Sequence, residues 1–247
     1  MRLKLHISPC PNDTFMFDAL VNGRIDTGSL RFEVEYHDIE ELNRGAGLGR
    51  ADISKISCAV LPAIAEHYVL LDSGAALGRG NGPLLVRRAG DTRPIRRVAV
   101  PGLHTTANAL MGKLFPKIEE RTPLLFSRIA AAVERGDFVY RQRQLELVAD
   151  LGQLWEQRTA LPLPLGGIAA RRSLPDEVRH EAERLLRTSI EYAFTHPEAS
   201  RTYIKQHAQE LDDKVIDAHI ALFVNGYSLS LGDEGRRAVE ALTGVIP

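Results

Sequence analysis

The sequence has few of the residues on which disulfide-linked, metal-clustered or nucleic-acid-binding proteins depend. Among 247 residues there are two cysteines and one tryptophan. Cys10 and Cys58 are too few for a disulfide framework or a cysteine-rich metal cluster, so we expect two small buried thiols in a reducing compartment. The 31 basic and 32 acidic residues leave a net charge of −1. This balance offers no basic stripe for nucleic acid.

Long apolar runs are also missing. No stretch approaches the roughly 20 apolar residues that span a bilayer. The N-terminus is interrupted by Arg2 and Lys4 and lacks the pattern of a secretory signal. We therefore expect a cytoplasmic globular protein with no membrane partner, long enough for one large domain or two small ones.

Strand-like and helix-like segments alternate along the chain, which predicts an α/β fold. Four polar loops each follow a predicted strand, at residues 8–14, 55–57, 74–82 and 102–106. Ligands of open α/β sheets bind beyond the carboxyl ends of the strands. One shared cleft would therefore account for all four loops.

The loop that begins at Ser8 precedes a predicted helix and contains two prolines, which fix its backbone. Asn12 or Asp13 can cap that helix, and its free N–H groups favour an anion. Thr105 and Thr106 place two hydroxyl groups at the start of another predicted helix, which also suits a carboxylate or phosphate. Each loop has a simpler interpretation as a capped turn that binds nothing.

Several segments, in this order along nearly the whole chain, resemble those of the 1,4-dihydroxy-6-naphthoate synthases, which act in menaquinone biosynthesis by the futalosine route. The segments are SPCPNDTF from Ser8, Lys55-Ile56-Ser57, SGAALGRG from Ser73, His104-Thr105-Thr106, Asp150-Leu151-Gly152 with Trp155-Glu156, and Leu161–Ile168. The resemblance implies a fold similar to type II periplasmic binding proteins, with a ligand cleft between two α/β lobes. We assign residues 1–100 and 197–247 to the first lobe and residues 101–196 to the second. The proline- and glycine-rich run 161–168 is expected to be a rigid segment at the edge between them.

The resemblance also implies a lyase reaction without a metal or organic cofactor. Cyclic dehypoxanthinylfutalosine would be converted to 1,4-dihydroxy-6-naphthoate by base-initiated C–C cleavage and aromatisation. The implied partner is thus a small aromatic carboxylate, and the protein is expected to be a monomer or homodimer. Roles in binding this substrate carry over to Lys55, Ile56, Ser57, Thr105 and Thr106, with Ser8, Asn12 and Asn43 as further candidates. Lys55 can equally be a solvated cation, and Asn43 a helix C-cap.

The chain departs from the family's pattern at one point. The catalytic base of the family is a histidine in a segment that follows the helix predicted to end at Gly136. Here Asp137 is followed directly by Phe138, and about eleven residues, roughly twice a typical loop, have no counterpart. Either the printed sequence omits them, or the protein lacks them and is expected to be inactive. Of the eight histidines, His104 alone is predicted to lie in the cleft, as a weak substitute for the base.

Two other functions remain open at this point. A non-enzymatic solute-binding protein would share the fold, and chorismate dehydratase is a related enzyme of similar fold. The SPCPNDTF and GAALGRG segments favour the naphthoate synthase.

Overall fold

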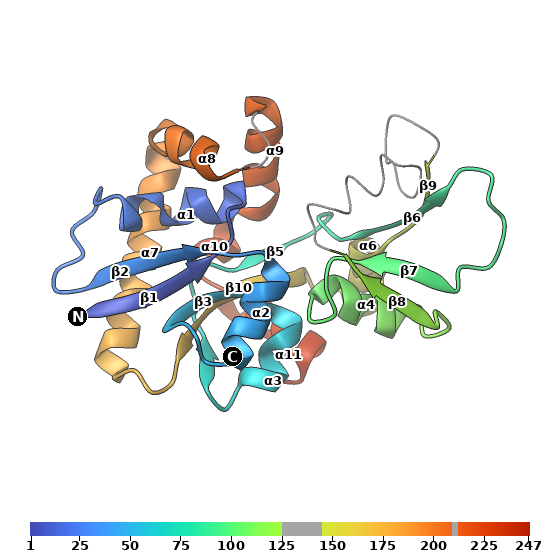
Figure 1. The fold of residues 1–247 in the computed structure, drawn as a ribbon, viewed down its shortest axis with the longest axis horizontal. Coiled ribbons are helices and arrows are strands. Elements are labelled where there is room, and N and C mark those ends of the chain that lie inside the picture. Colours follow the sequence, from blue (N-terminus) through green and yellow to red (C-terminus); the bar gives the residue numbers. More distant parts are fainter. Residues whose placement is uncertain (125–144, 209–211) are drawn as a thin grey trace.

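The computed structural model describes residues 1–124, 145–208 and 212–247. Strands and helices alternate, as predicted, and form two lobes that lie side by side (Figure 1). The predicted α/β fold is confirmed. Within the described ranges, every helix is too short or too polar to cross a membrane.

The larger lobe is built on one mixed sheet with the strand order β2-β1-β3-β10-β4, in which β5 also pairs with β10. β1 runs parallel to β2 and β3, whereas β10 is antiparallel to β3, β4 and β5. The six strands are β1 (Arg2–Ile7), β2 (Arg31–Tyr36), β3 (Ile53–Ser57), β4 (Tyr68–Leu70), β5 (Ala76–Gly78) and β10 (Leu163–Arg171).

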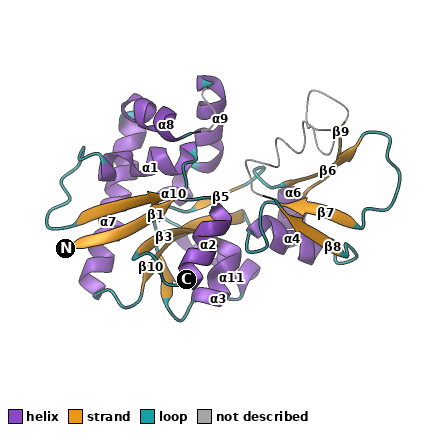
Figure 2. Cartoon of the chain, in the orientation of Figure 1, coloured by secondary structure: helices purple, strands orange, loops and turns teal. Residues whose placement is uncertain are grey.

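Helices cover both faces of this sheet (Figure 2). One layer contains α1 (Pro11–Val21), α7 (Asp176–Thr195), α8 (Arg201–His207) and α9 (Asp213–Phe223). The other contains α2 (Ile39–Gly47), α3 (Leu61–Ile64) and α11 (Gly232–Thr243), with the short α10 (Gly226–Leu229) beside β5. Two 3-10 turns, Cys58–Val60 and Pro197–Ser200, precede α3 and α8.

The smaller lobe has two strand pairs. β6 (Leu84–Arg88) is antiparallel to β9 (Leu145–Asp150), and β7 (Arg97–Val100) is parallel to β8 (Glu120–Pro123). The helices in the described part of this lobe are α4 (Thr106–Leu114) and α6 (Leu151–Thr159). The helix predicted from residue 127 to 136 lies outside the described residues.

Apolar alternation along the strands places two cores on opposite faces of the large sheet. Leu3, Leu5 and Ile7 of β1 are fully buried against α1 and α7. Ile56 of β3 belongs to the other core, which extends through Leu77 to α11 and into the smaller lobe. This continuity fixes the two lobes against each other, because apolar side chains of both are removed from water together.

The strand pairing assigns several elements to the other lobe than the one predicted from boundaries at residues 100 and 196. β6 and β7, assigned by sequence to the first lobe, pair with β9 and β8 of the smaller lobe. β10 and α7, assigned to the second, belong to the large sheet and its helix layer. The chain thus crosses between lobes near residues 79–84 and 160–163. Most of the run 161–168 is part of β10, a central strand rather than a segment at the edge between the lobes.

Candidate active site

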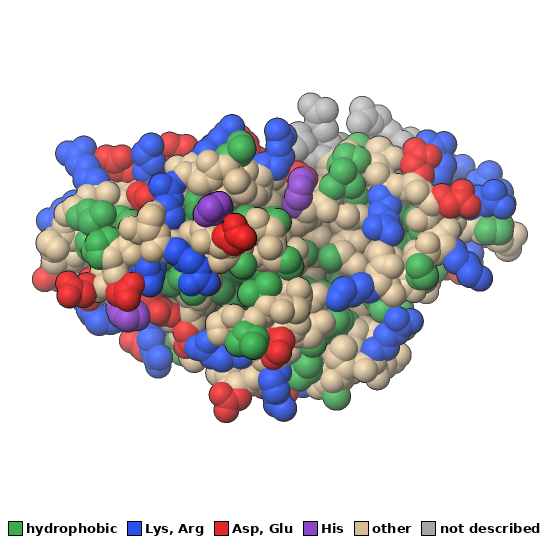
Figure 3. Space-filling model, turned by 90° about the horizontal axis from the view of Figure 1, so that it is seen from below, with side chains coloured by type: hydrophobic (Ala, Val, Ile, Leu, Met, Phe, Trp, Pro, Cys, Tyr) green, Lys and Arg blue, Asp and Glu red, His purple; other side chains and the backbone are tan. Residues whose placement is uncertain are grey.

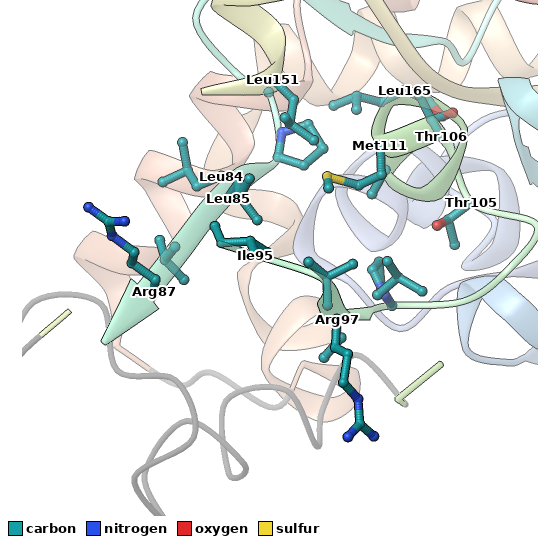
Figure 4. Close-up of a pocket in the computed structure, with 18 of the residues that line it drawn as sticks. Leu84, Leu85, Arg87, Ile95, Arg97, Thr105, Thr106, Met111, Leu151 and Leu165 are labelled. Carbon is teal, nitrogen blue, oxygen red and sulfur yellow. The ribbon is translucent and has the colours of Figure 1, made fainter. Parts of the chain in front are cut away.

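A cavity of about 830 Å³ is lined by residues of both lobes. Its volume is in the range of small-molecule sites. Most of the wall is apolar and comes from β6, the chain before β7, helices α4 and α6, and β10. It includes Leu84, Leu85, Ile95, Met111, Leu151 and Leu165 (Figure 4). The hydroxyl residues Ser57, Thr105 and Thr106 form what we call the polar end, and charged residues such as Arg87, Asp91 and Arg97 line other parts of the cavity. Such a cavity suits a mainly apolar ring compound that carries a polar group at one end.

Ser57 ends β3 and is held in place by Asn43 of α2. The Asn43 side-chain NH₂ donates to Ser57 Oγ at 3.0 Å, and the Ser57 backbone N–H donates to Asn43 Oδ1 at 2.8 Å. Because Ser57 Oγ accepts from Asn43, its own O–H can donate into the cavity. Asn43 lies inside α2, whose C-cap is Leu48, so the alternative prediction of a helix C-cap is wrong.

The loop 101–106 brings the smaller lobe onto the start of α2. Asn43 also donates to the His104 carbonyl at 3.2 Å, and Glu40 accepts from the His104 backbone N–H at 3.1 Å. A side chain at Gly102 would place its Cβ 2.2 Å from Glu40 Oε2, so only glycine allows this approach. His104 Nδ1 lies 2.6 Å from Glu40 Oε1, and half of the His104 side chain is exposed. The loop therefore uses His104 as a contact between the lobes, outside the residues that line the cavity.

Thr105 and Thr106 begin α4, as the sequence predicts. Thr105 is the N-cap: its Oγ1 accepts from the Asn108 backbone N–H at 3.3 Å and donates to the Gly102 carbonyl at 2.8 Å. Thr106 Oγ1 donates to the Leu165 carbonyl of β10 at 2.8 Å. Both hydroxyl groups thus position the start of α4, where unpaired backbone N–H groups and the helix dipole favour an anion.

A buried ion pair lies under the first loop, between α1 and β3. Lys55 Nζ is 2.8 Å from Asp13 Oδ1, and the Lys55 and Asp13 side chains are 7% and 0% exposed. Ser8 donates to Asp13 Oδ2 through its hydroxyl at 2.7 Å and its backbone N–H at 3.2 Å. Asp13 is not a helix cap, since Cys10 is the N-cap residue of α1 and Pro11 follows it. Its carboxylate instead fixes the loop to the sheet.

Asn12 extends this network to α9. Its NH₂ group donates to Asp13 Oδ1 at 2.9 Å, so its own Oδ1 faces His219 Nε2 at 3.1 Å. The Asp13 carboxylate can only accept a hydrogen bond, so the NH₂ group of Asn12 must face it. The amide oxygen of Asn12 also only accepts, so His219 carries its proton on Nε2 and keeps a lone pair on Nδ1. Burial lowers the pKa of His219, which favours the neutral ring. Phe223, one turn further along α9, packs against His219 with the rings tilted and their centroids 4.7 Å apart, and it lines the cavity.

The two cysteines are free thiols. Burial raises the pKa of Cys10, and it raises the pKa of Cys58 to about 12. A thiol with a raised pKa is a poor nucleophile because its thiolate form is scarce. The prediction of a buried thiol holds for Cys58, whereas Cys10 is half-buried.

The structure sorts the predicted site residues into three groups. Ser57, Thr105 and Thr106 line the cavity. Four polar residues do not line it: Asn43 holds Ser57 in place, and Ser8, Asn12 and Lys55 belong to the hydrogen-bond network around Asp13. Ile56 is fully buried in the core and does not line the cavity. The link between Asp137 and Phe138, where the sequence predicts a missing segment, lies outside the described residues.

Sequence reasoning missed His219 and most of the apolar wall. The residues of β6 and of the chain before β7 read as ordinary strand and loop positions, and nothing in their spacing indicates which side faces a ligand. His219 is 207 positions from Asn12, a separation that no local pattern reports.

Comparisons with known proteins agree with this arrangement. A family model described as menaquinone biosynthesis matches residues 3–246. A 1,4-dihydroxy-6-naphthoate synthase from Thermus thermophilus is 44% identical, with 97% of this chain and 92% of the relative covered. One from Streptomyces coelicolor is 40% identical, with 97% and 91% covered. The Thermus match extends over 256 positions and this chain has 247 residues, so that relative has residues without a counterpart here.

Solved structures give the same result. A protein from Archaeoglobus fulgidus, 31% identical, superposes with a TM-score of 0.90 over 98% of this chain and 95% of its own. A Candida albicans protein described as having the generic periplasmic binding protein fold is 12% identical and has a TM-score of 0.65, over 100% and 92% of the two chains. The fold is therefore of the periplasmic-binding-protein type, as the resemblance implied. By its match over nearly its full length, the chain belongs to the menaquinone biosynthesis family.

Proposed function

We propose that this protein is a 1,4-dihydroxy-6-naphthoate synthase, a carbon–carbon lyase of menaquinone biosynthesis that acts in the cytoplasm. The observation that carries the proposal is the 44% identity to an enzyme of that name over 97% of the chain. The cavity supports it, because an apolar wall with one polar end suits an aromatic carboxylate such as the product.

The polar end would bind the carboxylate. Ser57 has a hydroxyl proton free for a ligand among the described residues, and Thr105 and Thr106 stand at the N-terminus of α4. The apolar wall, with Leu85 and Met111, would hold the ring system and exclude water. Hydrogen bonds and the helix dipole are stronger in such a dry site, which favours oxyanions that develop as the C–C bond breaks.

A base must also remove a proton. Among the described residues, His219 is our candidate for this role because burial lowers its pKa and favours the neutral ring, and no described group binds its Nδ1. It does not itself line the cavity but packs against Phe223, which does. Asn12 orients its ring, and Asp13 with Lys55 orients Asn12. Lys55 is itself paired with Asp13, so its charge serves the network rather than the substrate.

The direct test incubates the purified full chain with cyclic dehypoxanthinylfutalosine and follows 1,4-dihydroxy-6-naphthoate by chromatography. We expect product from the wild type and a loss of about 10²-fold in kcat/KM for Ser57→Ala, as for removal of one oxyanion donor. A wild type that binds the product but forms none would instead support a binding protein.

A second pair of variants separates two sources of the base. His219→Asn should abolish turnover, whereas His180→Asn on the exposed face of α7 should not change it. If His219→Asn remains active, the role proposed for His219 is wrong. It is also wrong if the chain becomes active only when the extra residues of the Thermus relative are inserted between Asp137 and Phe138.

A further inference from the structure

Three groups that can ligate a metal meet on one face of the β1–β2 pair. His6 and Glu35 are opposite each other in the parallel register, and His37 follows the last residue of β2. Glu35 Oε2 lies 3.5 Å from His6 Nε2 and 3.1 Å from His37 Nε2. Metal bonds of 2.0–2.1 Å in a tetrahedral site place two ligand atoms about 3.3 Å apart. Both distances fit two edges of such a tetrahedron.

The third edge of the tetrahedron is the distance between the His6 and His37 nitrogens, and it is also compatible with a shared ion. All three ligand atoms lie within 4.8 Å of one another, and the two imidazole rings have centroids 5.1 Å apart. A small adjustment of the exposed Glu35 or the partly buried His37 would bring the nitrogens together around an ion. His6, on the strand itself, is the fixed member of the group.

His6 supplies the independent sign of a ligand. Its side chain is 8% exposed, and Nε2 is buried without a hydrogen-bond partner in the described part of the chain. Buried polar atoms are nearly always paired, because leaving one unpaired costs the full loss of its hydration. The unpaired atom is the one that faces Glu35 and His37, where an ion would satisfy it.

The ring of His37 is held in the orientation that metal binding requires. Glu41, in the first turn of α2, has Oε2 at 3.4 Å from His37 Nδ1. His37 Nε2 donates to the Glu35 carboxylate at 3.1 Å. A bound ion would replace this proton, and the ring would then carry its proton on Nδ1, toward Glu41. Carboxylate–histidine–metal arrangements of this kind are the rule in zinc proteins.

We propose that His6, Glu35 and His37 bind one divalent transition-metal ion, with zinc the favoured ion and water as its fourth ligand. Two imidazole nitrogens and one carboxylate select such ions over calcium or magnesium, which prefer oxygen ligands. The three ligands lie outside the cavity, but Ile39, two residues beyond His37, is part of its wall. The ion would therefore be structural and would tie β1 to the start of α2, which holds Glu40 and Asn43. This inference is independent of the proposed reaction.

The test uses the full chain without an affinity tag, stripped of metal with a chelator and titrated with Zn²⁺ by calorimetry. We expect one ion per chain. Glu35→Gln and His37→Ala should each weaken binding by at least about tenfold, and Glu41→Gln by about tenfold as an outer-shell change. His180→Ala removes an exposed histidine far from the cluster in sequence and should leave the affinity unchanged.

Variants at the exposed side of the site avoid the buried His6, whose replacement would disturb packing. Each variant is compared with wild type by thermal unfolding in chelator, to show that the fold is intact. Zn²⁺ should then raise the Tm of wild type and not that of His37→Ala. Absence of saturable one-to-one binding below about 100 μM, or an affinity equal to that of wild type in Glu35→Gln and His37→Ala, would overturn the proposal.

Discussion

The Lys55–Asp13 pair is expected to be among the most sensitive points of the fold. Replacing Lys55 with methionine keeps the length of the side chain and removes its charge. Asp13, which is 0% exposed, would then be a buried carboxylate without a counter-ion. Removing one partner of a buried pair costs about 3–5 kcal/mol, because the remaining charge has lost both water and its partner.

The structure places the expected cost at the lower end of this range. Asp13 keeps three hydrogen-bond donors when Lys55 is removed, namely the Ser8 hydroxyl, the Ser8 backbone N–H and the Asn12 NH₂ group. We therefore expect a loss of about 3 kcal/mol in the free energy of unfolding. For a chain of this size the Tm should fall by about 6–12 °C.

Thermal unfolding at pH 7 measures the effect, with two comparisons. Lys205→Met breaks the ion pair between Lys205 and Asp213, whose side chains are 38% and 55% exposed. This variant should lose less than about 1 kcal/mol in the free energy of unfolding. The double variant Lys55→Met with Asp13→Asn buries no charge and should recover part of the loss. If Lys55→Met unfolds within 1 °C of wild type, or if the double variant is less stable than Lys55→Met, the reasoning is refuted.

Three further predictions follow from individual contacts. Gly102→Ala should lower stability by about 1–3 kcal/mol, since its Cβ would lie 2.2 Å from Glu40 Oε2. As a control, Gly112→Ala in α4 faces only the flexible end of Arg121 from β8 and should leave the Tm unchanged or raise it. The pKa of the Cys58 thiol is raised to about 12. We therefore expect Cys58 to resist a thiol reagent at pH 8 in the folded protein and to react after denaturation. Rapid reaction of two thiols per folded chain would contradict this. Because the pKa of His219 is lowered, its neutral form persists as the pH falls past 6.5. We therefore expect kcat/KM to be constant above pH 7 and to decline only below the ordinary histidine pKa. A decline that begins above pH 7 would show that another group controls the reaction.

Much of the site could be predicted from the sequence because its polar loops follow strands. The side chains at the end of β3 and the start of α4 were expected in one cleft, and Ser57, Thr105 and Thr106 do line one cavity. The reason is geometric: strand ends converge at one edge of a sheet, and helix starts leave N–H groups unpaired there. Such polar positions can be predicted because they depend on residues that are adjacent in the sequence.

The lobe boundaries could not be predicted, because a central strand resembled a loop. The run from Pro162 to Gly167 has the composition of a turn, yet most of it lies in β10 between β3 and β4. Gly166 is there for a packing reason, since a Cβ would lie 2.7 Å from the Ile56 carbonyl oxygen. Glycine at a point of close backbone approach and glycine in a turn look the same in a sequence. Only the pairing partner distinguishes the two.

The same limit applies more strongly to the residue that we propose as the base. His104 follows a strand and was the natural choice for a residue in the cleft, but Glu40 draws its ring out of the cavity wall. His219 lies in a helix with no distinctive neighbours, and its role depends on Asn12, whose orientation depends in turn on Asp13 and Lys55. Two of these contacts, Asn12 with His219 and Asp13 with Lys55, join residues that are far apart in the sequence. Loops that bind are therefore visible locally, whereas the tautomer and pKa of a buried histidine are properties of the assembled network.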